Sequence, residues 1–102
     1  MGGITTVRVT ATATVVTGDV RYNGGFCHDL AGDAQMTVYK GTAATAANVI
    51  DILAASDEVQ TDRAFLPPPG IHCPGGIHCV VNNGDDFAIY YTAEGVVSVL
   101  VP

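Results

Sequence analysis

Apolar and polar residues alternate strictly along the segment from Thr5 to Val16. Successive side chains of a β-strand point to opposite faces, so this alternation is the pattern of a strand that buries one face only. The residues of the apolar face are Val7, Val9, Ala11, Ala13 and Val15. The sequence therefore predicts one long, half-buried strand over Thr5–Val16.

Shorter segments with strand character follow, separated by turn residues. They are Val20–Tyr22, Phe26–Ala31, Met36–Lys40, Asn48–Leu53, Asp86–Thr92 and Val96–Val101. Asn23-Gly24-Gly25 is expected to form a turn or a bulge, and Asn83-Gly84 the tip of a hairpin. The alanine-rich segment 42–55 also carries a helical face, but its neighbours are all β, so a strand is favoured there.

Strands of this kind, separated by turn residues, predict an all-β fold. We expect a single antiparallel β-sandwich of jelly-roll or Greek-key type over residues 1–102. Pro67–Pro69 is expected to carry the chain between the sheets, because proline cannot donate the hydrogen bond that a central strand needs. The N-terminal strand, within residues 1–16, is expected to engage neighbouring subunits.

The chain is poor in charge and acidic overall. Charged residues make up 14% of it, against about 25% in an average soluble protein. Lys40 is the single lysine, and the net charge is −6. Nucleic acids and anionic membranes require a basic surface, so neither is an expected partner. A surface so poor in charge suggests cover by another subunit. Met1-Gly2-Gly3 leads directly into the strand pattern, without the basic region and apolar run of a signal peptide, so we expect synthesis in the cytoplasm.

The segment MTVYKGTA, at Met36–Ala43, resembles the TVTVYDGTSA segment of small β-sandwich proteins encoded by tailed bacteriophages. Other segments are similar to the VI pair, the GIRF…GLYVVV pattern and the VTVYY strand of that family. Their counterparts here are Val49-Ile50, Gly70–Cys73, Gly76–Val81 and Ala88–Tyr91. The resemblance covers roughly Phe26–Thr92. It implies a β-sandwich with a structural role in the virion, such as capsid decoration (cement) or a fibre or tail accessory domain, and no catalytic residues.

Every cysteine of the chain stands beside a histidine. The sequence GIHC occurs twice, at Gly70–Cys73 and Gly76–Cys79, and Cys27-His28 is the third doublet. On a regular strand the two members of a doublet face opposite sides. The simplest interpretation is that the cysteines are small buried residues and that the histidines lie at the surface or in an interface.

Two other interpretations of the doublets stay open. A disulfide could join Cys73 to Cys79, or Cys27 to Cys79. A zinc or iron ion could also bind, although the spacing His-Cys-x4-His-Cys is not one of the common finger patterns. The candidate ligands are Cys73, His78 and Cys79, completed by Cys27 or His28, with His72 as a further candidate. The oxygen-rich segment 82–86 lacks the spacing of a calcium loop.

We expect a non-enzymatic structural protein of the virion, located in the particle, that binds the major capsid protein or another virion protein. A homo-oligomer is expected, with a trimer favoured, and no cofactor is required. The expected interface, formed by strand addition, consists of Val7, Arg8, Val9, Thr10, Thr12 and Thr14. The alternatives are a metal-binding module built on the doublets and a carbohydrate-binding fibre or tail accessory domain that uses the tyrosines.

Overall fold

The computed structural model describes residues 3–28, 34–55, 60–64, 70–84 and 86–100. In these ranges the chain forms ten strands and one short 3-10 helix, Ala46–Asn48. The strands are β1 Ile4–Val9, β2 Ala13–Thr17, β3 Val20–His28, β4 Ala34–Lys40, β5 Val49–Ala55, β6 Gln60–Ala64, β7 Ile71–Cys73, β8 Ile77–Asn83, β9 Phe87–Ala93 and β10 Ser98–Val99. The expected strand at segment 48–53 is confirmed.

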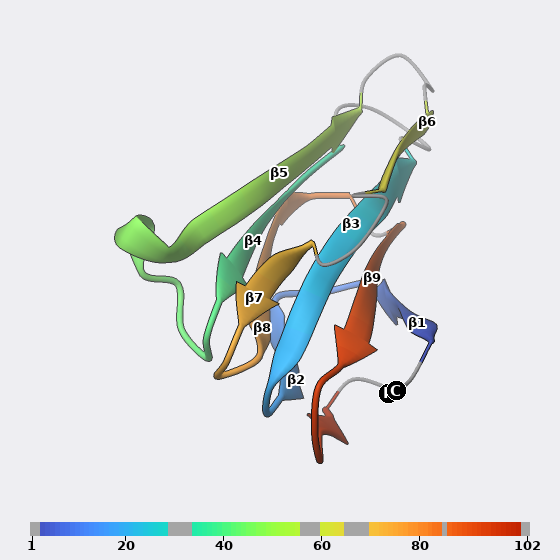
Figure 1. The fold of residues 1–102 in the computed structure, drawn as a ribbon. Helices are drawn as coiled ribbons and strands as arrows, with labels where there is room; N and C mark the ends of the chain where they lie inside the picture. Colours follow the sequence, from blue (N-terminus) through green and yellow to red (C-terminus); the bar gives the residue numbers. More distant parts are fainter. Residues whose placement is uncertain (1–2, 29–33, 56–59, 65–69, 85, 101–102) are drawn as a thin grey trace.

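The strands form two antiparallel sheets that pack face to face (Figure 1). In sheet A the order is β1-β9-β3, and β6 and β7 both pair with the far side of β3; in sheet B the order is β10-β2-β8-β4-β5. β1 packs across from β2, and β5 packs across from β3 and β6. The predicted all-β sandwich is confirmed.

The first predicted strand is wrong as a single element. The chain leaves sheet A after Val9 and enters sheet B at Ala13, so Thr5–Val16 is two strands that belong to different sheets. Both strands point their apolar residues into the same space between the sheets, because Val9 and Val15 are each almost fully buried. Alternation therefore continues through the crossing, and periodicity alone cannot detect a change of sheet.

Crossing between sheets is the general rule of this chain. Among the described strands, β4 and β5 are the only consecutive pair hydrogen-bonded to each other. The expected hairpin at Asn83-Gly84 is therefore wrong, since β8 lies in sheet B and β9 in sheet A. Pro67–Pro69 lies outside the described residues, but the strands on either side of it, β6 and β7, both pair with β3 in sheet A. The described strands before and after this segment therefore lie in the same sheet.

β3 is the longest strand and contains a bulge. Its register with β9 shifts between Tyr22 and Gly24, so the bulge expected at Asn23-Gly24-Gly25 is confirmed and the turn is not. Gly24 has a φ of +117°, a backbone conformation that glycine adopts without steric cost. Next to it, a Cβ at Gly25 would lie 2.6 Å from Leu53 Cδ1, so glycine allows the two sheets to approach closely here.

The final strand is shorter than predicted. β10 contains only Ser98 and Val99, paired with Thr17 and Val16 at the edge of sheet B. Val96, which the prediction placed in this strand, is 97% exposed. An edge strand pairs with one neighbour only, so extending β10 to include Val96 would add little stability.

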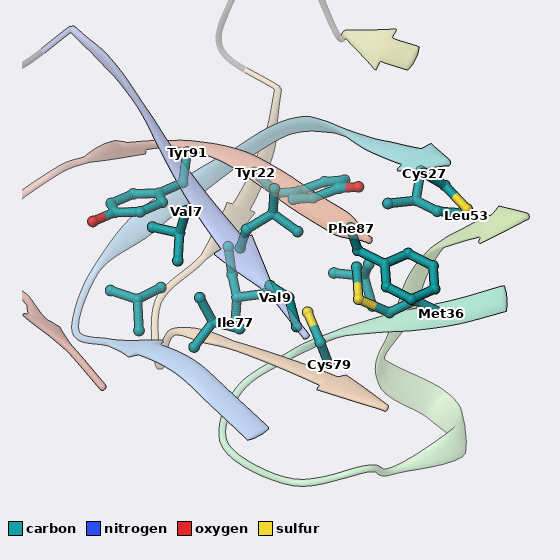
Figure 2. Close-up of a cluster of buried hydrophobic side chains, with 14 of the residues drawn as sticks. Val7, Val9, Tyr22, Cys27, Met36, Leu53, Ile77, Cys79, Phe87 and Tyr91 are labelled. Carbon is teal, nitrogen blue, oxygen red and sulfur yellow. The ribbon is translucent and has the colours of Figure 1, made fainter. Parts of the chain in front are cut away.

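The core fills the space between the sheets (Figure 2). Its largest members with essentially no exposed surface include Tyr22, Phe87, Met36, Leu53, Ile77 and Ile89. Phe87, Ile89 and Tyr91 of β9 share the inward face, as the sequence predicts. A polar contact crosses this core: the Tyr22 hydroxyl of sheet A donates a 2.7 Å hydrogen bond to Asp51 Oδ2 of sheet B.

Two neighbours on β5 offer a matched test of the core. Leu53 is fully buried, whereas Ile52 is 46% exposed on the opposite face. We expect Leu53→Ala to lower the free energy of unfolding by about 2–5 kcal/mol, because it removes buried contacts and leaves a cavity. Ile52→Ala should change it by no more than about 0.5 kcal/mol. Urea unfolding of both variants measures the difference, and equal losses would contradict the assigned faces.

Candidate functional site

Each Cys/His doublet divides its two side chains between the core and the outside. All three cysteines are fully buried, whereas the three histidines are partly or largely exposed. This follows from strand geometry, because the doublets lie in β3, β7 and β8 and neighbours on a strand face opposite sides. The interpretation of the cysteines as buried apolar residues agrees with this placement.

The cysteines approach the core from different strands. Cys27 and Cys73 come from sheet A and Cys79 from sheet B, and Figure 2 shows Cys79 among Val9, Ile77 and Met36. All three cysteines fall within the described residues, and none of the three forms a disulfide. Loss of solvation raises the pKa of Cys79 to about 12. Burial likewise raises the pKa of Cys73 to about 11, against weaker lowering effects of the Tyr22 backbone and Lys40.

The histidines have separate partners. His28 Nδ1 lies 3.1 Å from Asp86 Oδ2, and His72 Nε2 lies 2.6 Å from Asp19 Oδ1. His78 Nδ1 lies 2.9 Å from the Thr14 hydroxyl. Over the described part of the chain, no three His, Cys, Asp or Glu side chains gather as a metal site would require. The structure thus does not bring together the six residues proposed as zinc or iron ligands.

The predicted interface residues are also separated. Val7 and Val9 belong to the core of the same chain, and Arg8 points outward on β1, where its guanidinium lies 3.4 Å from Asp86. Thr10 is exposed in the crossing between β1 and β2, where Thr12 accepts a hydrogen bond from the Val81 amide. Only Thr14 lies on the outer surface of sheet B. The six residues therefore form no continuous surface.

The outer surface of sheet A carries charge. Arg8 and His28 both contact Asp86 at one end of the sheet. At the other end Arg21 is paired with Glu94, and His72 with Asp19. These side chains are between about one fifth and two thirds exposed, so each pair contributes only about 0–1 kcal/mol to stability. Their effect is to keep this surface polar and well solvated.

The outer surface of sheet B, called the B face below, has a different character. Two rows of cross-strand neighbours cover it. The first row is Thr14, His78, Tyr39 and Val49, and the second is Val80, Thr37 and Ile52. The strands of sheet B contain two formally charged residues, Lys40 at the end of β4 and Asp51, which is buried. The B face is thus a broad surface of apolar and neutral polar side chains.

Tyr39 and His78 lie together on neighbouring strands of the B face, β4 and β8, near one end of the sheet. Their ring centroids are 6.2 Å apart, and the Thr14 hydroxyl that contacts His78 also lies 3.3 Å from the Thr42 carbonyl oxygen. Val49 and Ile52 are 41% and 46% exposed on the same face. Aromatic side chains with a polar end, beside exposed aliphatic ones, are typical of protein–protein interfaces.

Sequence reasoning missed the B face, although a signal was present. The segments that form β2, β4, β5 and β8 contain only Lys40 and Asp51 as charged residues, but their grouping into one sheet depends on contacts distant in the sequence. The tyrosines are likewise dispersed: Tyr22 and Tyr91 are buried, and Tyr39 and Tyr90 lie on opposite outer surfaces. They form no common platform for a sugar.

Comparison with protein-family models, with curated proteins and with solved structures gave no match to this chain. In the described residues, no helix is long and apolar enough to cross a membrane.

The buried thiols predict a loss of stability in alkali. An exposed thiol in the unfolded chain ionises near its ordinary pKa of 9.0, whereas folded Cys79 keeps its proton to about pH 12. The unfolded state thus releases protons first, and the free energy of unfolding falls as the pH rises above 9, by at most about 1.4 kcal/mol per pH unit for each thiol.

Urea unfolding at several pH values between 8 and 11 tests this effect. Cys79→Ala should lose less stability over that interval than the natural chain does, since the variant has one thiol fewer to ionise. The two chains are compared by the slope of unfolding free energy against pH. The cost of the cavity that Cys79→Ala leaves is the same at every pH, so it does not affect this slope. Identical slopes would contradict the burial of the Cys79 thiol.

Proposed function

We propose that this chain is a non-enzymatic structural protein of a tailed-bacteriophage virion, and that it acts as a capsid decoration (cement) protein. Its B face would bind the major capsid protein or another protein of the head, and so bridge neighbouring subunits. The observation that carries the proposal is the contrast between the B face, with its two neutral rows, and the charged outer surface of sheet A.

The physical argument rests on the cost of removing groups from water. Docking the outer surface of sheet A would desolvate its ion pairs, and that cost commonly exceeds the attraction that remains. Docking the B face would bury Ile52 and Val80, which gain free energy on leaving water. The hydrogen-bonding groups of Thr14, Tyr39 and His78 would meet polar groups of the partner at the same time. The B face is therefore the better surface for stable protein contact.

The resemblance at Met36–Ala43 supports the same assignment. That segment includes most of β4, which places Tyr39 on the B face, and the following strand β5 supplies Val49 and Ile52. The part of the chain that resembles phage sandwich proteins thus includes most of the surface favoured for docking, apart from Thr14 of β2. The proposal places the protein in the virion, after synthesis in the host cytoplasm.

The test is binding to phage heads. Heads of the phage that encodes this chain, produced without it, are mixed with the purified protein and sedimented. We expect the natural chain to sediment with the heads and Tyr39→Ala to bind at least about tenfold more weakly, as expected for loss of a buried tyrosine anchor. Tyr90→Ala, which changes a half-buried tyrosine on the outer surface of sheet A, is the matched control.

Loss of binding in Tyr39→Ala alone supports both the function and the face. Equal binding by the two variants, whether both lose affinity or neither does, would contradict the B face. No sedimentation of the natural chain with any head would overturn the proposed function.

A further inference from the structure

Large apolar side chains that remain exposed lie at the margins of the two sheets. Six described residues of this kind are more than two fifths exposed: Ile4, Val49, Ile52, Val96, Val99 and Leu100. Val49 and Ile52 belong to the edge strand β5, Ile4 belongs to the edge strand β1, and the other three lie in or beside the edge strand β10. β1 and β10 lie on one side of the sandwich, since β1 packs on β2 and β2 pairs with β10. Figure 1 shows β1 and β5 at opposite margins of the molecule.

The edge of β5 is protected against further strand pairing. A bulge interrupts its register with β4 between Val38 and Tyr39. Beside this bulge, the inward-pointing Asp51 accepts a 2.8 Å hydrogen bond from the backbone amide of Ile52 through Oδ1. Bulges and inward-pointing charges on an edge strand are known devices that prevent one sheet from adding to another.

The edge of β1 has none of these devices. Its six residues pair with β9 in an unbroken register from Ile4 to Val9, and they include no proline. Arg8 is its single charged residue, and it points outward and contacts Asp86 of the same chain. No described strand pairs with the other side of β1. A regular, nearly uncharged edge of this kind is a template for another strand.

We propose that β1 binds β1 of a second copy of this chain, antiparallel and about a twofold axis, so that the two A sheets join into one. Val7 and Val9 point inward, so Ile4, Thr6 and Arg8 point outward. Directly opposite residues of an antiparallel pair point to the same side, so the two pairings that use five residues of β1 are centred on Thr6 or on Val7. We choose the one centred on Thr6, opposite Thr6 of the partner, because only this pairing also includes the exposed Ile4. Ile4 then lies opposite Arg8 of the second copy, whose aliphatic stem can cover it.

Charge favours this edge over the outer surface of sheet A for self-association. Each copy has a net charge of −6, so two copies repel each other wherever acidic groups meet. β1 contains no acidic residue, and threonines opposite one another on neighbouring strands form a favourable pair. The two Arg8 residues would stand about 14 Å apart by strand geometry, farther than the Debye length of about 8 Å at physiological salt.

This dimer replaces the trimer expected from the sequence, and it leaves the B face open. A twofold axis perpendicular to sheet A carries each B face to the same side of the dimer. Two such faces on one side can bind two neighbouring sites on a repeating surface, and the second contact gains from the high effective concentration that the first creates. The dimer itself is argued from β1 alone and does not depend on the phage assignment.

The experiment measures the mass of the full chain in solution, with and without a charge introduced at the twofold axis. Light scattering coupled to size-exclusion chromatography gives the oligomeric state. The protein concentration should span about 1–300 µM, because an edge contact buries little surface and the dimer is expected to be weak. Thr6→Asp would bring two carboxylates opposite each other and should weaken the dimer at least about tenfold. Thr45→Asp, at an exposed position before the 3-10 helix, has the same net charge and should leave the dimer intact.

A mixing experiment separates lost contact from lost folding. Thr6→Lys should also dissociate the dimer, whereas an equal mixture of Thr6→Asp and Thr6→Lys should restore it. A natural chain that is monomeric over the whole range, or a closed trimer, would overturn the proposal. So would a dimer that Thr6→Asp leaves unchanged, or failure of the mixture to associate.

Discussion

Two sheets share one core in this molecule, and each strand can contribute only alternate side chains to it. This constraint places every cysteine inside and its neighbouring histidine outside, since the doublets lie on strands. It also makes one polar contact important. Tyr22 and Asp51 come from opposite sheets and meet in the interior, and a buried carboxylate oxygen left without a donor is costly. The Tyr22 hydroxyl satisfies Oδ2, as the Ile52 amide satisfies Oδ1, and this bond between the sheets favours their pairing.

The sequence predicts much of the local structure and little of the connectivity. The strands at Met36–Lys40 and Asp86–Thr92 were predicted nearly to their ends, because alternation and glycine at the ends are local signals. Thr5–Val16 and Asn83-Gly84 were misread for a common reason. A turn that joins two paired strands and a turn that crosses between sheets use the same residues, and both keep the apolar side facing the core. Only contacts between distant strands distinguish them.

The candidate surfaces show the same limit. The burial of Cys79 and the exposure of His78 follow from the strand pattern, but the row formed by Thr14, His78 and Tyr39 joins residues from three strands. No local pattern predicts that row. The edge of β1 lies between these cases: its regular, nearly uncharged character is visible in the sequence, and its position at the margin of sheet A is not. We therefore propose different tasks for the two outer surfaces and the open edge: solvation for sheet A, head binding for the B face and self-association for β1.

The central claim is that the B face docks on the phage head, and cryo-electron microscopy of the assembled particle tests it most directly. We predict density for the sandwich on the outside of the head, with the strands β2, β8, β4 and β5 against the shell and the charged surface of sheet A toward solvent. A sandwich that contacts the shell through the outer surface of sheet A, or heads without this protein, would contradict the account.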